Sequence, residues 1–161
     1  MQIEITEAFS HPDTMRELFR EYTDALLVAQ PDFADYLFSI QNFEDELLHL
    51  DAKYGPPRGR LYLALADGKP AGCVALKPID DTRCELKRLY VREAFRHAGL
   101  GEMLVDKILA DAREIGYSHM LLDTFPFLRS AIRIYRAKGF YDVESYNNSP
   151  MDGLVYLQLD L

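Results

Sequence analysis

The sequence of 161 residues contains no long uninterrupted apolar run. A helix that crosses a membrane needs about 18 or more consecutive apolar residues, so the sequence predicts no such helix. The amino-terminal stretch MQIEITEAFSHPD also lacks the basic and then apolar layout of a secretion signal. We therefore expect a cytoplasmic protein with no membrane partner.

Cysteine is scarce, and histidine occurs only at scattered positions. The two cysteines, Cys73 and Cys84, have no CxxC spacing and the four histidines stand singly, so we expect no metal site. If Asp80 and Asp81 form a turn, Cys84 lies opposite Lys77, four residues from Cys73 along the strand. That separation is about 13 Å at about 3.3 Å per residue, which is too far for a disulfide. We predict that both thiols are reduced core residues.

Clusters of lysine and arginine are also missing. The net charge is −8, and binding to nucleic-acid phosphates requires clustered basic residues, so we expect no nucleic-acid partner. The acidic excess is confined to residues 1–50, which hold eleven acidic residues and two arginines, while the rest of the chain carries a net charge of +1. This first third is interpreted either as a solvated surface or as a wall that attracts a cationic substrate.

Apolar periodicity and turn residues divide the chain into strands and helices. An Asp67-Gly68 pair between two apolar runs predicts a hairpin. The expected strands span residues 2–6, 60–66, 71–79, 84–91, 119–122 and 154–159, and the expected helices span residues 12–30, 43–50, 100–115 and 127–138, with a loop at 53–59. Together they predict a single domain over residues 1–161 of the α/β class, in which helices cover a mixed, mostly antiparallel sheet.

Two glycines at the start of a predicted helix form the pattern Arg96-x-x-Gly99-x-Gly101. A Walker-type phosphate loop requires Gly-Lys-Ser/Thr, whereas the chain here reads Gly-Glu-Met. A dinucleotide fingerprint requires a third glycine where this chain has Leu104. The free amides and the positive dipole end of a helix start still make a site for a diphosphate, and glycines let it approach the backbone.

The string CELKRLYVREAFRHAGLGEMLVDKILADAREIGY resembles the coenzyme-binding motif of the GNAT N-acetyltransferase superfamily. That motif is Arg/Gln-x-x-Gly-x-Gly/Ala after a strand that ends in an apolar-x-Val triplet. The later string AIRIYRAKGF resembles the family's helix that ends in a tyrosine followed by a Gly-Phe turn. The segments PPRG, LDT-x-P and YNNSPMDGLVYLQLDL are similar to those of a subgroup of small bacterial GNAT proteins with no agreed substrate. The resemblance implies the GNAT fold over nearly the whole chain.

The resemblance implies acetyl-CoA as the co-substrate and assigns it to particular backbone groups. The strand backbone of Leu89, Tyr90 and Val91 would pair with the pantetheine arm as an added strand. The amides of six consecutive residues would hold the pyrophosphate, namely Arg96, His97, Ala98, Gly99, Leu100 and Gly101. The alternatives are a surface salt bridge for Arg96, solvent exposure for His97 and a tight helix entry without ligand for the glycines. Many relatives contact pantetheine through an asparagine where this chain has Leu128, and Ser130 is the substitute we consider.

The implied chemistry is attack of an amine on a thioester, which needs a base, a donor for the oxyanion and an acid for the leaving thiolate. Glu85 matches the family position of a base, and the alternative is a strand-edge charge paired with Lys87 or Arg83. Asp123 is a second candidate base or amine anchor, and its alternative is a helix cap.

Tyr135 matches the family tyrosine that protonates the thiolate, although its spacing also suits a core position. The oxyanion would be bound by a backbone amide near Leu89.

The acceptor side of this fold is built largely by the first two helices and the loop before the last strand. The acidic residues there are Asp32, Asp35, Glu44, Asp45 and Glu46, and the candidate aromatic lining is Tyr36, Phe38, Phe43 and Tyr146. We therefore predict a cationic primary amine as acceptor, such as a small amine, an amino-sugar or a peptide amine. A non-catalytic acyl-CoA-binding or sensing module is the rival interpretation, and a homodimer, the assembly of many relatives, stays open.

Overall fold

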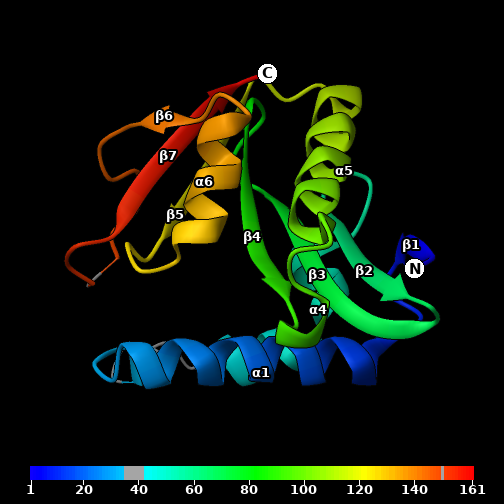
Figure 1. Cartoon of the computed structure of the whole chain (residues 1–161). Coiled ribbons are helices and arrows are strands. Elements are labelled where there is room, and N and C mark those ends of the chain that lie inside the picture. The colour runs from blue at the N-terminus through cyan, green and yellow to red at the C-terminus, as the bar shows by residue number, and fades with distance from the viewer. Residues whose placement is uncertain (35–41, 150) are drawn as a thin grey trace.

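In a computed structural model that describes residues 1–34, 42–149 and 151–161, seven strands form one twisted sheet. The strands are β1 (Ile3–Glu7), β2 (Arg60–Ala66), β3 (Lys69–Pro78), β4 (Arg83–Val91), β5 (His119–Thr124), β6 (Tyr141–Asp142) and β7 (Val155–Asp160). Their order across the sheet is β1-β2-β3-β4-β5-β7-β6 (Figure 1). The β4–β5 pair is parallel and the other neighbouring pairs are antiparallel, which confirms the predicted mixed sheet.

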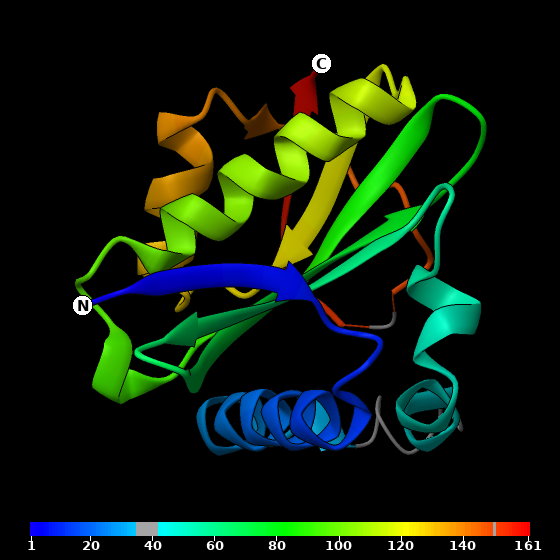
Figure 2. The ribbon, with the colours of Figure 1, turned by 90° about the vertical axis from the view of Figure 1, so that its right-hand side faces the viewer.

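Helices cover both faces of this sheet. The helices are α1 (Pro12–Ala29), α3 (Asn42–Leu48), α4 (Leu50–Tyr54), α5 (Leu100–Ile115) and α6 (Arg129–Ala137). Figures 1 and 2 show α1 on one face and α5 with α6 on the opposite face. None of the helices in the described ranges is long and apolar enough to cross a membrane.

The alternation of side chains along β2 shows how one strand serves two cores. Leu61 and Leu63 belong to the core that includes Phe19 of α1, whereas Tyr62 and Ala64 belong to the core beneath α5. Successive side chains of a strand point to opposite faces, so a strand that is apolar throughout is buried on both sides. The near-continuous apolar run of this strand therefore reflects its position inside a three-layer molecule.

The neighbouring strands β4 and β5 pair over only a short distance. Residues 83–85 of β4 pair with residues 119–121 of β5, and beyond Glu85 the two strands diverge, as Figure 1 shows. Residues 86–91 of β4 therefore pair with β3 on one side and present an open backbone edge on the other.

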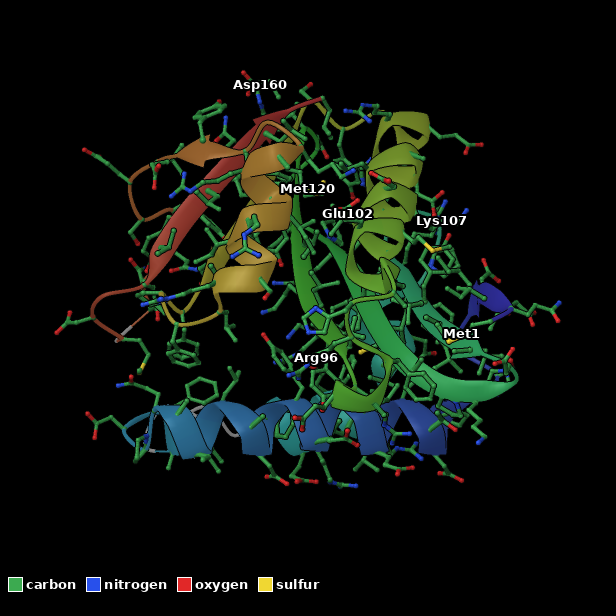
Figure 3. All side chains as sticks on the ribbon, viewed as in Figure 1. Met1, Arg96, Glu102, Lys107, Met120 and Asp160 are labelled. Carbon is green, nitrogen blue, oxygen red and sulfur yellow. The ribbon has the colours of Figure 1, made fainter. Side chains whose placement is uncertain are left out.

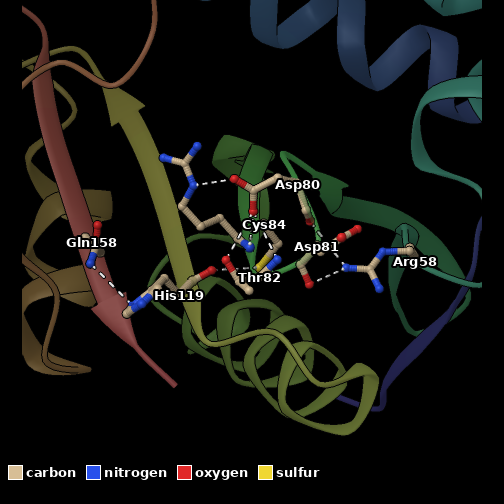
Figure 4. Close-up of polar contacts among 8 residues, drawn as sticks. Arg58, Asp80, Asp81, Thr82, Cys84, His119 and Gln158 are labelled. Atoms are coloured by element: carbon tan, nitrogen blue, oxygen red, sulfur yellow. Dashed lines mark hydrogen bonds and ion pairs between the residues drawn. The ribbon is translucent and has the colours of Figure 1, made fainter.

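A polar network holds β4 and β5 together at the end where they pair (Figure 4). The carboxylate of Asp80 accepts hydrogen bonds from the backbone amides of Thr82 and Arg83 at 3.0 and 2.8 Å. Arg58 donates to the carbonyl oxygen of Asp80 at 3.3 Å, and the amide of Ser118 donates to the carbonyl oxygen of Thr82 at 2.8 Å. Because the turn, the loop before β2 and the start of β5 are tied together here, the two strands separate only toward their far ends.

A β-bulge interrupts the pairing of β4 with β3. Arg88 and Leu89 lie opposite the single Val74, and Arg88 adopts a φ of 60°. The Cys73 thiol donates to the carbonyl oxygen of Arg88 at 3.3 Å. A bulge redirects the side chains around it, and here it lies beside the open edge of β4.

Most of the predicted elements are confirmed, and two are corrected. The predicted helix at 43–50 is two helices separated at His49, and the second extends to Tyr54, inside the predicted loop. Leu50 and Tyr54 are four residues apart and both buried, so packing outweighs the loop signal of the prolines and glycines that follow. The short strand β6 was not predicted.

The prediction for the cysteines is confirmed in its chemistry and wrong by one residue in its register. Cys73 and Cys84 are free and buried. Cys84 lies opposite Pro78, whereas Lys77 lies opposite Glu85. The turn closes through the amide of Ile79, which donates to the carbonyl oxygen of Arg83 at 2.9 Å.

Candidate active site

A cavity of about 660 Å³ lies against the diverging part of β4 and β5. Its walls come from α1, α3, α4, α6, the strands β3 to β5 and the loop before β7. The charged residues that line it are Glu46, Lys53, Lys77, Glu85, Lys87, Arg88 and Asp123, and the aromatic ones are Tyr22, Phe33, Phe43, Phe125, Tyr135 and Tyr146. The predicted residues Glu85, Asp123, Tyr135 and Tyr146 thus meet in one cavity.

Glu85 is held by a tyrosine of the last loop. Its side chain lies on β4 with the residue only 7% exposed, and the Tyr146 hydroxyl donates a hydrogen bond to its carboxylate. Burial and the negative charge of Glu85 raise the pKa of Tyr146, so this tyrosine stays a proton donor at neutral pH. Arg83 pairs instead with Asp80, with 2.8 Å between Nε and Oδ2. The interpretation of Glu85 as a strand-edge partner of Arg83 is therefore wrong.

Asp123 occupies the end of β5 and is held by the same loop. The Asn147 side-chain amide donates to its carboxylate at 2.8 Å. Helix α6 has Leu128 as its N-cap residue, without a side-chain cap, so Asp123 does not cap that helix. Because Tyr146 and Asn147 are adjacent, one loop positions both carboxylates of the cavity.

Tyr135 is a core residue that also reaches the cavity. Its ring packs against Phe140 with 5.6 Å between the ring centroids, and the residue lies in the core beneath α5. It also lines the cavity. Burial raises the pKa of Tyr135, which keeps its hydroxyl protonated at neutral pH. Within the described ranges, no residue forms a hydrogen bond with this hydroxyl.

The loop before α5 exposes a series of backbone amides. Among the described residues, none accepts a hydrogen bond from the amides of residues 97–101. The amide of Arg96 differs, because it donates to the carbonyl oxygen of Glu93 at 3.3 Å. The Arg96 amide thus has an acceptor within the chain, while the amides of His97, Ala98, Gly99, Leu100 and Gly101 are available to the predicted phosphate.

Glycine is needed at the two positions of this loop for different structural reasons. Gly99 has a φ of 80°, a backbone conformation that residues with a Cβ rarely adopt. The space around it is open, because a Cβ added there would meet nothing within 4 Å. At Gly101 an added Cβ would lie 2.9 Å from Cδ1 of Ile134. The smallness of Gly101 therefore lets α6 pack close to α5, and Gly99 provides the turn into the helix.

Arg96 itself ties this loop to the open strand edge. Its Nε donates to the carbonyl oxygen of Val91 at 3.0 Å, and Figure 3 shows Arg96 beside β4. No ion pair of Arg96 occurs in the described part of the chain, so the alternative interpretation of Arg96 as a surface salt-bridge residue is wrong. The Val91 carbonyl is therefore occupied, and Tyr90 turns its carbonyl toward Gly72 of β3. Because successive residues of a strand face opposite neighbours, the open backbone edge is left to Leu89 and the amide of Val91.

Several other predicted site residues lie away from the cavity. Ser130 is exposed in the first turn of α6. Asp45 is exposed on α3, with 3.2 Å between its Oδ1 and Nδ1 of His49, and does not line the cavity. Asp32 and Glu44 are exposed as well. Asp35, Tyr36 and Phe38 lie outside the described residues.

The remaining acidic residue of that segment, Glu46, is buried and neutralised. Arg88 donates to its two carboxylate oxygens at 3.0 Å each, and Lys53 donates to it as well. Burial would raise the pKa of Glu46, but Arg88 and Lys53 outweigh it and lower the pKa to about 2. The interpretation of the first third as an acidic wall facing the substrate is therefore wrong for Asp45 and Glu46.

Two lysines complete the cavity and were not predicted as site residues. Lys77 on β3 lies opposite Glu85, and Lys87 follows two residues after Glu85 on β4. Burial, with a contribution from Arg88, lowers the pKa of Lys87 to about 8. The sequence could have identified Lys87 as a site residue, because the alternation of side chains along a strand places Glu85 and Lys87 on the same face.

No group of three or more histidine, cysteine, aspartate or glutamate side chains in the described ranges is arranged to hold a metal ion.

Known proteins resemble this chain in both sequence and fold. The model of the acetyltransferase (GNAT) family matches residues 13–140. An uncharacterised N-acetyltransferase of Schizosaccharomyces pombe is 41% identical over 125 residues, covering 76% of this chain and 77% of the relative. A GNAT-family acetyltransferase of Staphylococcus aureus superposes with a TM-score of 0.75 at 21% identity, over 99% of both chains. The PaiA N-acetyltransferase of Thermoplasma acidophilum, solved in complex with coenzyme A, has a TM-score of 0.75 at 18% identity over 100% of both chains. The chain therefore belongs to the GNAT family of acetyltransferases.

Proposed function

We propose that this chain transfers the acetyl group of acetyl-CoA to a primary amine, with Glu85 as general base and Tyr135 as general acid. The observation that carries the proposal is the meeting of Glu85, Asp123 and Tyr135 in one cavity where β4 and β5 diverge. A base and an acid that line the same cavity are what attack on a thioester requires.

The coenzyme fits the opposite side of this divergence. The unpaired amides of residues 97–101 and the dipole of α5 suit a pyrophosphate. The open edge at Leu89 and the amide of Val91 offers backbone groups to an extended pantetheine arm. The relative from Thermoplasma acidophilum, which superposes over its whole length, was solved in complex with coenzyme A.

The reaction follows from these positions. The amine enters as an ammonium ion, and Glu85 takes one of its protons directly or through water. The nitrogen attacks the carbonyl carbon of the thioester, and the amide near Leu89 binds the oxyanion. The carbon–sulfur bond then breaks and Tyr135 gives its proton to the sulfur. The second proton released from nitrogen restores Tyr135, so the products are an amide, a free thiol and one proton on Glu85.

The acceptor side follows from the same cavity. Glu85 and Asp123 are its carboxylates that Arg88 and Lys53 do not neutralise, and they suit the ammonium group of a small amine, an amino-sugar or a peptide amine. The exposed acidic residues of the first third add no cationic preference, because they lie outside the cavity.

The test is thiol release from acetyl-CoA with a panel of primary amines, for the parent protein, Glu85→Gln and Tyr135→Phe. Glu4→Gln, an exposed carboxylate on β1, is the matched control. We expect turnover in the parent and the control, and loss of turnover in both site variants while coenzyme binding, measured by calorimetry, is retained. A parent that binds coenzyme and acetylates no amine would instead be a sensing module.

A further inference from the structure

The charged side chains that line the cavity do not all pair with one another. Four basic side chains, Lys53, Lys77, Lys87 and Arg88, accompany three acidic ones, Glu46, Glu85 and Asp123. Arg88 and Lys53 both bind Glu46, which accounts for one acidic and two basic groups. Two lysines and two carboxylates remain.

Those two carboxylates bind neutral donors and not the lysines. Glu85 accepts a hydrogen bond from Tyr146, and Asp123 accepts one from Asn147. Among the described residues, the ammonium groups of Lys77 and Lys87 form no ion pair or hydrogen bond. A partly buried cation without a partner is costly, so a site that keeps two of them is suited to an anion from outside the chain.

The two lysines also flank the proposed base. Lys77 is the cross-strand partner of Glu85, and directly opposed residues in antiparallel strands have Cβ atoms about 5 Å apart. Lys87 lies two residues along β4 from Glu85 on the same face. An acceptor whose nitrogen is at Glu85 can therefore place a second group, a few bonds from that nitrogen, between the lysines. An α-amino carboxylate has this spacing.

Resting on the proposed function, we propose that the acceptor is an amine that also carries a carboxylate, and that Lys77 and Lys87 bind this carboxylate. The two lysines are then specificity residues that distinguish amino acids and related acceptors from neutral amines. This assignment reverses the prediction of a cationic acceptor, because it rests on the side chains that reach the cavity and not on the net charge of a segment.

The first experiment compares acceptors with and without the carboxylate, and kcat/KM is expressed per concentration of free amine because amidation also makes the α-amine less basic. Thiol release is measured with L-phenylalanine against L-phenylalaninamide, and with glycine against glycinamide. We expect kcat/KM to favour the acid of each pair by about tenfold, the size of a hydrogen bond to a charged group. The ratio should fall toward one in Lys77→Gln and Lys87→Gln, and stay unchanged in Lys69→Gln, an exposed lysine on the same strand as Lys77.

The second experiment measures binding of the expected product in the absence of turnover. N-acetyl-L-phenylalanine, which carries the carboxylate of the expected product, should raise the melting temperature of the parent more than N-acetyl-L-phenylalaninamide does. Lys77→Gln and Lys87→Gln should lose this difference. Equal effects of acid and amide on the parent in either experiment would overturn the proposal. Absence of thiol release with every amine would overturn the proposed function, while the melting experiment still decides whether the lysines bind a carboxylate.

Discussion

The two sides of the β4–β5 divergence use different parts of the polypeptide. On the coenzyme side, the groups on offer are backbone amides of residues 97–101 and the open edge of β4. On the acceptor side, the groups are charged and aromatic side chains contributed by helices, strands and the last loop. A backbone site tolerates substitution unless the chain path changes, whereas a side-chain site depends on each residue. Variants on the coenzyme side should therefore change coenzyme affinity, whereas variants on the acceptor side should change turnover of the amine.

The largest effect is expected from Glu46→Gln on the acceptor side. Arg88, whose side chain is 14% exposed, would lose its carboxylate partner, and breaking a buried ion pair costs about 3–5 kcal/mol. Chemical denaturation should show this loss, and Glu44→Gln, an exposed neighbour paired with Arg20, should change the free energy of unfolding by less than about 1 kcal/mol.

The same variant has a pH signature. Glu46 has its pKa lowered from 4.5 to about 2 in the folded state, so its contribution is fully present above pH 4.5 and is lost as the pH falls toward 2. The difference in unfolding free energy between the parent and Glu46→Gln should shrink over that interval. A difference that is constant from pH 6 to pH 3 would contradict the assignment.

Tyr146→Phe is expected to have the next largest effect. It removes the hydroxyl that donates to the buried Glu85, and leaving a buried acceptor unsatisfied costs about 1–3 kcal/mol. We expect a lower free energy of unfolding and reduced thiol release with unchanged coenzyme affinity. Tyr141→Phe, which removes an exposed hydroxyl bonded to Asp160, is the control. Loss of coenzyme binding in Tyr146→Phe would break the separation of the two sides.

The third prediction concerns the charge of Lys87. Its pKa is lowered to about 8 by burial and Arg88, against the opposing effects of Glu85 and Glu46, and Lys53 lowers it further. The charged form binds a carboxylate, so the affinity for N-acetyl-L-phenylalanine should fall by about tenfold as the pH rises through about 8. Lys87→Arg should stay charged and keep its affinity to higher pH. A flat profile in the parent would show that Lys87 does not bind the carboxylate.

Gly99→Ala should give the smallest effect, confined to the coenzyme side. The left-handed conformation at a φ of 80° costs a residue with a Cβ about 1 kcal/mol. We expect a few-fold loss of coenzyme affinity with an unchanged KM for the amine. An altered amine KM with normal coenzyme affinity would contradict the comparison.

The same contrast explains what the sequence could predict. The glycine loop is a local pattern, so its position, the sheet that presents it and the start of α5 could all be derived from residues close together in the chain. Glu85 and Tyr135 were singled out by a family resemblance that depends on such local strings. The structure places them in one cavity.

The acceptor side could not be derived in this way. The acidic composition of the first third does not say which of its side chains face the cavity. In the structure Asp45 is exposed to solvent, and Glu46 is neutralised by Arg88 and Lys53. Lys77 reaches the cavity only through the register of a hairpin. These are contacts between distant segments, which composition does not encode.

The most direct test of the account is a calorimetric titration of acetyl-CoA into the parent and into Glu85→Gln, with thiol release measured on the same samples. The account predicts one saturable site of equal affinity in both proteins and turnover only in the parent. Coenzyme affinity that disappears together with turnover in Glu85→Gln, or no saturable heat in the parent, would contradict it.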